Sequence, residues 1–322
     1  LINFIRGLDS YDEDGDGNTS ESRHKLGDIY HSNINIVGTP SASLQYANEF
    51  QTGFYRSQNG YSNFMSQYSG RRETIYVGAN DGMLHAFDAI TGDELWAFIP
   101  PSLHSKLSTM ISTKANSTNS IYGVDGSSSV RDVYIDGKWK TVLISSLGAG
   151  GHSFFALDIT DPGNPEHLFT VNNDIFNSKV SFWTKNDIEQ IYAYSSNMDA
   201  ENDYRKLGET WSTPRIVKLK IDGADKWVAI AGGGYNGATN PNYGSAVFVI
   251  DLEDGGKVLK RIDITDSASS NIVNSVPADL AVITADGTEK ANYTGALVYV
   301  ADLEGKITKI NLTDQGTMYQ QT

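Results

Sequence analysis

The chain has 322 residues, of which 39% are hydrophobic and 20% charged, and its formal net charge at pH 7 is −14. Because so acidic a chain repels phosphate backbones, nucleic acid is not an expected partner. The absence of cysteine excludes disulfides, zinc–thiolate sites and cysteine nucleophiles, and there is no apolar run of about 18 residues that would span a membrane.

Residues 1–28 are polar and acidic, and they are predicted to form a lead-in segment before a single domain over residues 29–322. The segment starts at Leu1 without an initiator Met or a signal peptide, which is typical of a piece of a longer protein. Localisation therefore has to be inferred from other features.

The lead-in segment contains a candidate calcium loop, in which oxygen-bearing side chains alternate along the chain. Such alternation lets one loop wrap a hard cation, and a glycine at the sixth position, here Gly17, permits the sharp turn. Position twelve is Arg23 instead of a bidentate Glu, so Glu21 or Asp28 would have to replace that ligand. A solvated acidic linker is the alternative interpretation. The predicted Ca²⁺ ligands are Asp12, Asp14, Asp16, the backbone carbonyl of Asn18, and Ser20 directly or through water.

Downstream of this loop, short strands alternate with turns, and a few longer insertions interrupt them. Residues 29–37 are predicted to form an alternating strand, and residues 45–72 a long loop rich in Ser, Tyr, Asn and Gly. Residues 100–119 have room for a short helix, and residues 172–208 form the largest insertion.

The most informative stretch is ANDGMLHAFDAITGDELWAFIP, residues 79–100, which predicts a meander of strands joined by DG and TG turns. Its Trp96 is expected to be buried between sheets. Degenerate repeats of this motif, called the blade phrase below, recur along the chain. Asp88, Asp158 and Asp251 occupy the same position in three copies, and a fourth copy covers residues 297–312. Unequal spacing favours a propeller over a solenoid. We predict an all-β fold, a modified β-propeller of six or seven blades, most simply seven, with long loop insertions.

Several stretches resemble the C-terminal propeller of the PilC/PilY family of type IV pilus-associated adhesin and biogenesis proteins. They are IRG and LGDIYHS near the N-terminus, YVGANDGMLHAFDAITGDELWAFIP, the stretch from Tyr122 to Pro162, WSTPRIVKL, KWVAIAGGGYNG, and VYVADLEGKITKINL. They follow one another in the family's order and cover most of the chain.

The resemblance implies a non-enzymatic domain acting in adhesion, pilus extension and retraction, and twitching motility. It implies minor or major pilins and a host-cell or surface receptor as partners. It also implies a place at the pilus tip or cell surface, associated with the outer membrane, after export through the periplasm.

One feature of the family is not carried over. Relatives place a D-x-D-x-D-x-x-x-D calcium loop before the strand that corresponds to residues 297–300, whereas this chain has Asp279, Asp286 and Glu289 there without alternation. The loop at Asp12 is therefore the better candidate for calcium.

Two alternative functions remain open at the level of sequence. A quinone-dependent propeller dehydrogenase shares the DG…D…W blade phrase, but such enzymes commonly use an adjacent cysteine pair, which this chain lacks. A propeller scaffold of outer-membrane assembly shares blade phrases but would lack the LGDIYHS stretch.

Overall fold

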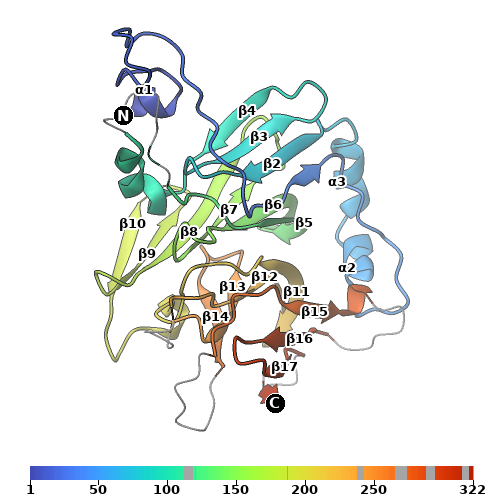
Figure 1. Cartoon of the computed structure of the whole chain (residues 1–322). Coiled ribbons are helices and arrows are strands. Elements are labelled where there is room, and N and C mark those ends of the chain that lie inside the picture. The colour runs from blue at the N-terminus through green and yellow to red at the C-terminus, as the bar shows by residue number, and fades with distance from the viewer. Residues whose placement is uncertain are drawn as a thin grey trace.

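The computed structural model describes residues 1–111, 119, 121–186, 188–237, 243–264, 274–287, 294–313 and 319–321. Within them, strands dominate and form four antiparallel sheets, arranged around one another as Figure 1 shows. The all-β class predicted from the turn pattern is therefore confirmed.

Each sheet follows chain order, as expected when consecutive strands are joined by tight turns. The first sheet contains β1 (Asn35–Val37), β2 (Thr74–Gly78), β3 (Leu84–Asp88) and β4 (Glu94–Phe98). The second contains β5 (Ser128–Ile135), β6 (Lys138–Ser146), β7 (Ser153–Asp158), β8 (Glu166–Asp174), β9 (Lys179–Thr184) and β10 (Glu189–Ala193). The third contains β11 (Arg215–Ile221), β12 (Ala224–Gly232), β13 (Ala246–Asp251) and β14 (Val258–Asp263). The fourth contains β15 (Ala281–Thr284), β16 (Ala296–Ala301), β17 (Ile307–Asn311) and β18 (Tyr319–Gln321).

The core consists of apolar seams between successive sheets. Leu84 of the first sheet packs in one cluster with Phe155 of the second. Phe154 of the second sheet shares a cluster with Phe248 of the third. The third and fourth sheets meet in a cluster rich in Val, Ile and Leu. Sheets that bury both faces against their neighbours in this way are the packing expected of propeller blades.

Helices are few and short in the described part of the chain. They are α1 (Ile2–Ile5), α2 (Thr52–Gln58), α3 (Tyr61–Gln67) and the 3₁₀ helices η1 (Pro101–Met110), η2 (Ala200–Asn202) and η3 (Ala285–Gly287). The short helix expected within residues 100–119 is confirmed by η1. The strand expected over residues 29–37 is confirmed only at its end, as β1.

The prediction that residues 45–72 form a long loop is wrong, because α2 and α3 lie there. Tyr61 and Phe64 are three residues apart and therefore share one face of α3. Both are buried, and the Tyr61 ring lies 4.7 Å from the ring of Trp139 in β6. Because the stretch is rich in Ser and Asn, its composition favours a loop and does not reveal the apolar face of α3.

The repeated aspartate has the same local role in all four sheets. Its carboxylate accepts a hydrogen bond from the backbone N–H two positions later, at 2.8 to 3.0 Å, which shapes the turn after the strand. The four residues are Asp88, Asp158, Asp251 and Asp302. In the first three sheets this aspartate ends the third strand, and a register shift lies just before it in the pairing with the fourth strand.

The described residues form four sheets, where the repeats predicted six or seven blades. Each copy of the blade phrase belongs to one sheet. The prediction added further blades between the copies, and it therefore exceeded the number of sheets among the described residues. Part of the insertion at residues 172–208 extends the second sheet as β9 and β10, and residues 45–72 contribute helices. The division of the chain after residue 28 stays a prediction.

Candidate functional site

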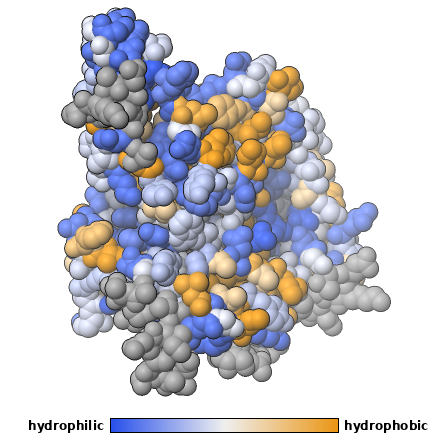
Figure 2. All heavy atoms as spheres, viewed as in Figure 1, coloured by the Kyte–Doolittle hydropathy of each residue, from blue (hydrophilic) through white to orange (hydrophobic). Residues whose placement is uncertain are grey.

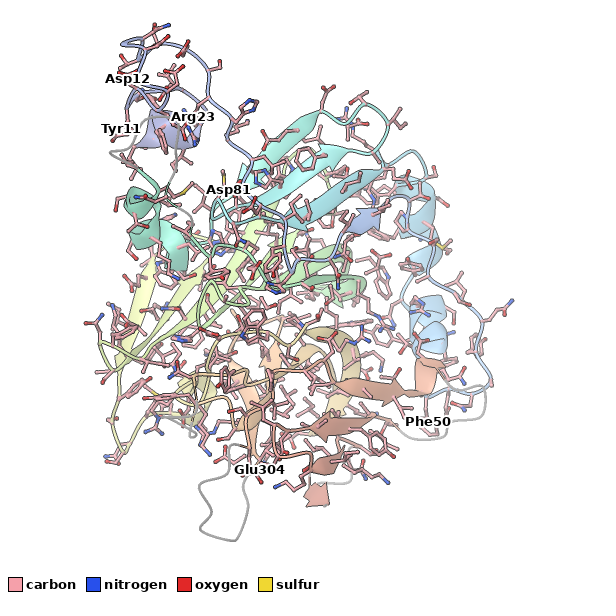
Figure 3. All side chains as sticks on the ribbon, viewed as in Figure 1. Tyr11, Asp12, Arg23, Phe50, Asp81 and Glu304 are labelled. Atoms are coloured by element: carbon pink, nitrogen blue, oxygen red, sulfur yellow. The ribbon has the colours of Figure 1, made fainter. Side chains whose placement is uncertain are left out.

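The lead-in segment, residues 1–28, projects beyond the first sheet and η1 (Figure 1), and Asp12, Tyr11 and Arg23 lie together at its far end (Figure 3). A small apolar cluster fastens its base. Phe4 and Ile5 of α1 are buried against Met83, Leu107 and Met110, from the turn before β3 and from η1. Beyond this small cluster, the contacts that hold the segment to the first sheet are mainly hydrogen bonds and ion pairs.

A buried histidine connects the segment to the first sheet. Nδ1 of His85 lies 2.8 Å from Oε1 of Glu94, and its Nε2 lies 3.0 Å from Oδ2 of Asp81. From the lead-in segment, Lys25 pairs with the same Glu94, and the Gly27 N–H donates to Asp81 at 2.7 Å. Burial alone would lower the pKa of His85, but its hydrogen bonds to the two carboxylates raise it overall.

Two further bonds hold the chain where it leaves the lead-in segment. The Asn80 N–H donates to the backbone carbonyl of Asp28 at 2.9 Å. Nδ1 of His31 lies 2.7 Å from Oδ2 of Asp125, a buried carboxylate between the first and second sheets. Residues 25–31 are thus fixed along the first sheet, at one end of the acidic loop.

The loop itself is built by side chains that bond its own backbone. Asp12 Oδ1 accepts from the Gly17 N–H at 3.0 Å, across five residues, and Asp14 Oδ1 accepts from the Asp16 N–H at 3.2 Å. Gly17 takes a φ of 87°, which glycine adopts without strain. Asp16 in turn accepts from the Asn18 N–H at 2.7 Å. The alternating carboxylates are therefore gathered on the inside of a turn.

Asn18 and Ser20, the two other predicted ligands, bond each other. The N–H and the hydroxyl of Ser20 donate to Asn18 Oδ1 at 3.2 and 2.8 Å. The side-chain oxygen of Asn18 is thereby engaged within the loop. Ligation by either residue stays a prediction.

Carboxylate oxygens meet in two groups that share one residue. Asp12, Asp14 and Asp16 have ligand atoms within 4.8 Å of one another, and so do Asp9, Asp14 and Glu21. Partial desolvation and the four neighbouring aspartate carboxylates raise the pKa of Glu21. Glu21, one of the two candidates for the missing bidentate ligand, therefore lies at the site.

Sequence reasoning missed Asp9, which lies three positions before the loop and outside its alternation. Its side chain is only 3% exposed, and both of its carboxylate oxygens accept from the Glu13 N–H at 2.8 Å. Arg23, in the twelfth position, pairs with Glu13 at 2.7 Å and lies over the Phe4 ring at 3.9 Å. Arg23 therefore anchors the loop to α1.

The second carboxylate group opens onto a cleft of about 1230 Å³ between the lead-in segment and the first sheet. Asp9, Asp14 and Glu21 line one side, and Asn80 and Asp81 line the other. A cation held by this group could thus be approached from the cleft.

The acidic residues that precede residues 297–300, which the sequence resemblance suggested as another calcium position, serve other purposes here. Asp286 pairs with two arginines, Arg56 of α2 at 3.2 Å and Arg131 of β5 at 2.7 Å. Asp279 accepts a backbone N–H at 2.7 Å. Glu289 lies outside the described residues. The two described acids are thus bound within the protein.

Trp96 is less enclosed than the blade phrase suggested. Its Nε1 donates to the Pro162 carbonyl at 2.8 Å, and its ring lies 5.7 Å from that of Tyr76, but the side chain is only partly buried. The expectation of full burial is wrong, because the indole lies at the rim of the seam between the first and second sheets.

Comparison with known proteins assigns this fold to a class and then to a family. A crystal structure of the Pseudomonas aeruginosa PilY1 C-terminal domain superposes with a TM-score of 0.59 and 28% identity, over 86% of this chain and 45% of that one. The model of the PilY1 β-propeller domain matches residues 26–317, so the fold is an all-β, propeller-like one.

The chain belongs to the PilY1 β-propeller family, as the sequence resemblance predicted. The type IV pilus biogenesis factor PilY1 of Pseudomonas aeruginosa strain UCBPP-PA14 is 31% identical over 97% of this chain, and a homologue in Xylella fastidiosa is 34% identical over 97%. These matches cover 22% and 19% of those relatives, so the chain spans about a fifth of their length. Both relatives are named for type IV pilus biogenesis, which favours the pilus interpretation over the dehydrogenase alternative.

Proposed function

We propose that this domain acts in type IV pilus biogenesis as a calcium-dependent binding module at the cell surface. The observation that carries the proposal is membership of a family whose relatives are named type IV pilus biogenesis factors. The partners would be minor or major pilins and a host-cell or other surface receptor. Adhesion and twitching motility would follow from those contacts, with the domain at the pilus tip or outer membrane. No helix in the described part of the chain is long and apolar enough to cross a membrane.

Calcium would bind the lead-in segment through Asp12, Asp14 and Asp16, with Asn18 and Ser20 completing the loop. Two carboxylate groups that share Asp14 support this, since mutual repulsion between carboxylates is relieved by a divalent cation. The chemistry of the donor set also fits, because hard oxygen ligands suit Ca²⁺. The incomplete ligand set should give a Kd in the ~10⁻⁴–10⁻³ M range of extracellular modules.

The pilus role is tested in a strain that lacks the full-length gene, by counting surface pili and measuring twitching zones after complementation. Wild type should restore both. Wild-type complementation without pili would contradict the role in biogenesis.

Calcium binding is tested by calorimetric titration of the full-length protein. The double variant Asp14→Ala/Asp16→Ala should lose the heat of calcium binding, whereas Asp93→Asn, which changes an exposed carboxylate in the β3–β4 turn, should keep it. Equal heats from all three proteins would place calcium elsewhere. Equal piliation by the calcium-loop variant and wild type would separate calcium from biogenesis.

A further inference from the structure

The second sheet ends at β10 in an edge that differs from the corresponding edges of the first and third sheets, β4 and β14. In the first, second and third sheets, the pairing of the third strand with the fourth contains a register shift one or two residues before the repeated aspartate. Such bulges twist an outer strand and discourage pairing with another chain. β4 and β14 are outer strands of this kind, and η2 also packs against β14.

In the second sheet, β8 occupies the place of the bulged outer strand, but β9 and β10 continue the sheet beyond it. Their pairing is regular, with six opposed residues between β8 and β9 and five between β9 and β10. β10 contains neither Pro nor Lys, the residues that commonly protect sheet edges. The added hairpin thus replaces a bulged edge with a straight one, and β10 is the outermost strand in Figure 1.

Among the described residues no strand pairs with the outer side of β10, called here its free side, and the backbone groups there follow from its register. The Tyr194 N–H donates to the Ser178 carbonyl at 2.8 Å, which continues the ladder in which Ala193 opposes Lys179. Bonded and non-bonded residue pairs alternate in an antiparallel ladder, so the even-numbered residues of β10 bond β9. The N–H and C=O groups of residues 189, 191 and 193 therefore point away from the sheet.

The side chains beside these groups are exposed and mostly uncharged. Ile191 is 55% exposed and Ile188 is 64% exposed, and the Phe176 ring at the β8–β9 turn is 94% exposed. Figure 2 shows a small apolar group at the left edge of the molecule, where Figure 1 places β9 and β10. Glu189 is the one charged residue of β10.

We propose that the free edge of β10 binds an extended segment of a pilus component, which adds a strand to the second sheet. Three outward donors and three outward acceptors at alternate residues are the groups that an added strand bonds, and side chains next to them supply selectivity. The segment would be neutral or basic, because the chain as a whole is acidic, and it would place an apolar residue opposite Ile191. Glu189, the one acid of β10, already accepts a hydrogen bond from Ser181 and pairs with Lys179. This inference rests on the proposed pilus function and names the surface that would serve it.

A proline at residue 191 is a selective test of this edge. The backbone N–H of Ile191 is one of the outward groups. Because proline has no N–H, Ile191→Pro removes a donor from the free side of β10, while the hydrogen bonds between β9 and β10 remain. Ile191→Val is the matched control, since valine keeps both the donor and an apolar β-branched side chain.

The probe is purified type IV pili of the same organism, immobilised on a biosensor and exposed to the full-length protein. Ile191→Pro should bind at least about tenfold more weakly than wild type, and Ile191→Val should bind like wild type. Hydrogen exchange of wild type with and without pili gives a second readout that needs no variant. The amides of residues 189, 191 and 193 should exchange at least about tenfold more slowly with pili, while those of the β3–β4 turn should not change.

Wild-type binding with unchanged exchange along β10, or equal binding by Ile191→Pro, would overturn the edge as the docking surface and leave the pilus role standing. Failure of wild type to bind pili would also overturn this inference. In that case the piliation of the complemented strain decides separately whether the domain acts in biogenesis.

Discussion

The lead-in segment and the seam between the second and third sheets are ordered by different forces. At the seam, Phe248 is fully buried and its ring stacks on Tyr204 at 5.1 Å, within a large apolar cluster. The lead-in segment has a small apolar base around Phe4 and otherwise depends on carboxylates, Lys25 and His85. Calcium and protons should therefore act on the lead-in segment and leave the sheets nearly unaffected.

The largest expected effect separates the two regions by core truncation. Phe248→Ala should lower the free energy of unfolding of the sheets by ~3–5 kcal/mol, because it removes a fully buried ring. Phe4→Ala should instead free only the lead-in segment, since its cluster lies at the base of that segment. Chemical denaturation measures the first effect and hydrogen exchange of residues 1–28 the second. A large loss of global stability in Phe4→Ala would show that the two regions unfold together.

Calcium should produce the next largest effect, and it should be confined to the lead-in segment. At about 100 times the Kd, binding to the folded state alone adds ~2.7 kcal/mol to the unit that unfolds with the loop. Hydrogen exchange of residues 9–21 with and without calcium measures this gain, with Asp14→Ala as the control. Slower exchange in the sheets as well would contradict the division between the regions.

Trp96→Ala should cost less than a core truncation, about 1.5–2.5 kcal/mol, since the indole is only partly buried. Part of that loss comes from the hydrogen bond to the Pro162 carbonyl. A shift of the denaturation midpoint measures it. A loss as large as that of Phe248→Ala would show that partial exposure is a poor guide at this position.

The smallest expected effect is on the pH dependence of the lead-in contacts. Because the pKa of His85 is raised above 6.5 in the folded state, its contribution is fully present below about pH 6.5 and is lost as pH rises through the folded pKa. The pKa of Glu94 is lowered despite burial, through Lys25 and His85, so its contribution is lost as pH falls below about 4.5. Exchange of residues 25–28 between about pH 3 and 8 measures both. A profile unchanged in His85→Gln would contradict this assignment.

Local patterns in the sequence predicted the sheets better than their number. The repeated aspartate predicts a strand end and a turn, and the structure has one at each of the four copies. The number of sheets depends on whether β9 and β10 extend the second sheet or begin another one, and the turn signals are the same in both cases. The burial of Trp96 was overestimated because it depends on the neighbouring sheet, which is distant in sequence.

The candidate calcium site was predictable only where its residues follow one another. Asp12, Asp14 and Asp16 alternate, so their meeting could be expected. Asp9 joins Asp14 and Glu21 because the chain folds back between residues 8 and 22, which pair in an isolated bridge. No local periodicity signals that pairing.

Asp286 bears on how the domain would respond to tension. It lies next to the fourth sheet and pairs with Arg56 of α2 and Arg131 of β5, which come from two other parts of the chain. A pull on the C-terminal end would load these two ion pairs along with the apolar seam behind them. The pair between Arg131 and Asp286, whose side chains are 28% and 23% exposed, weakens with added salt, whereas the apolar seam does not. The force at which the fourth sheet detaches should therefore fall as ionic strength rises.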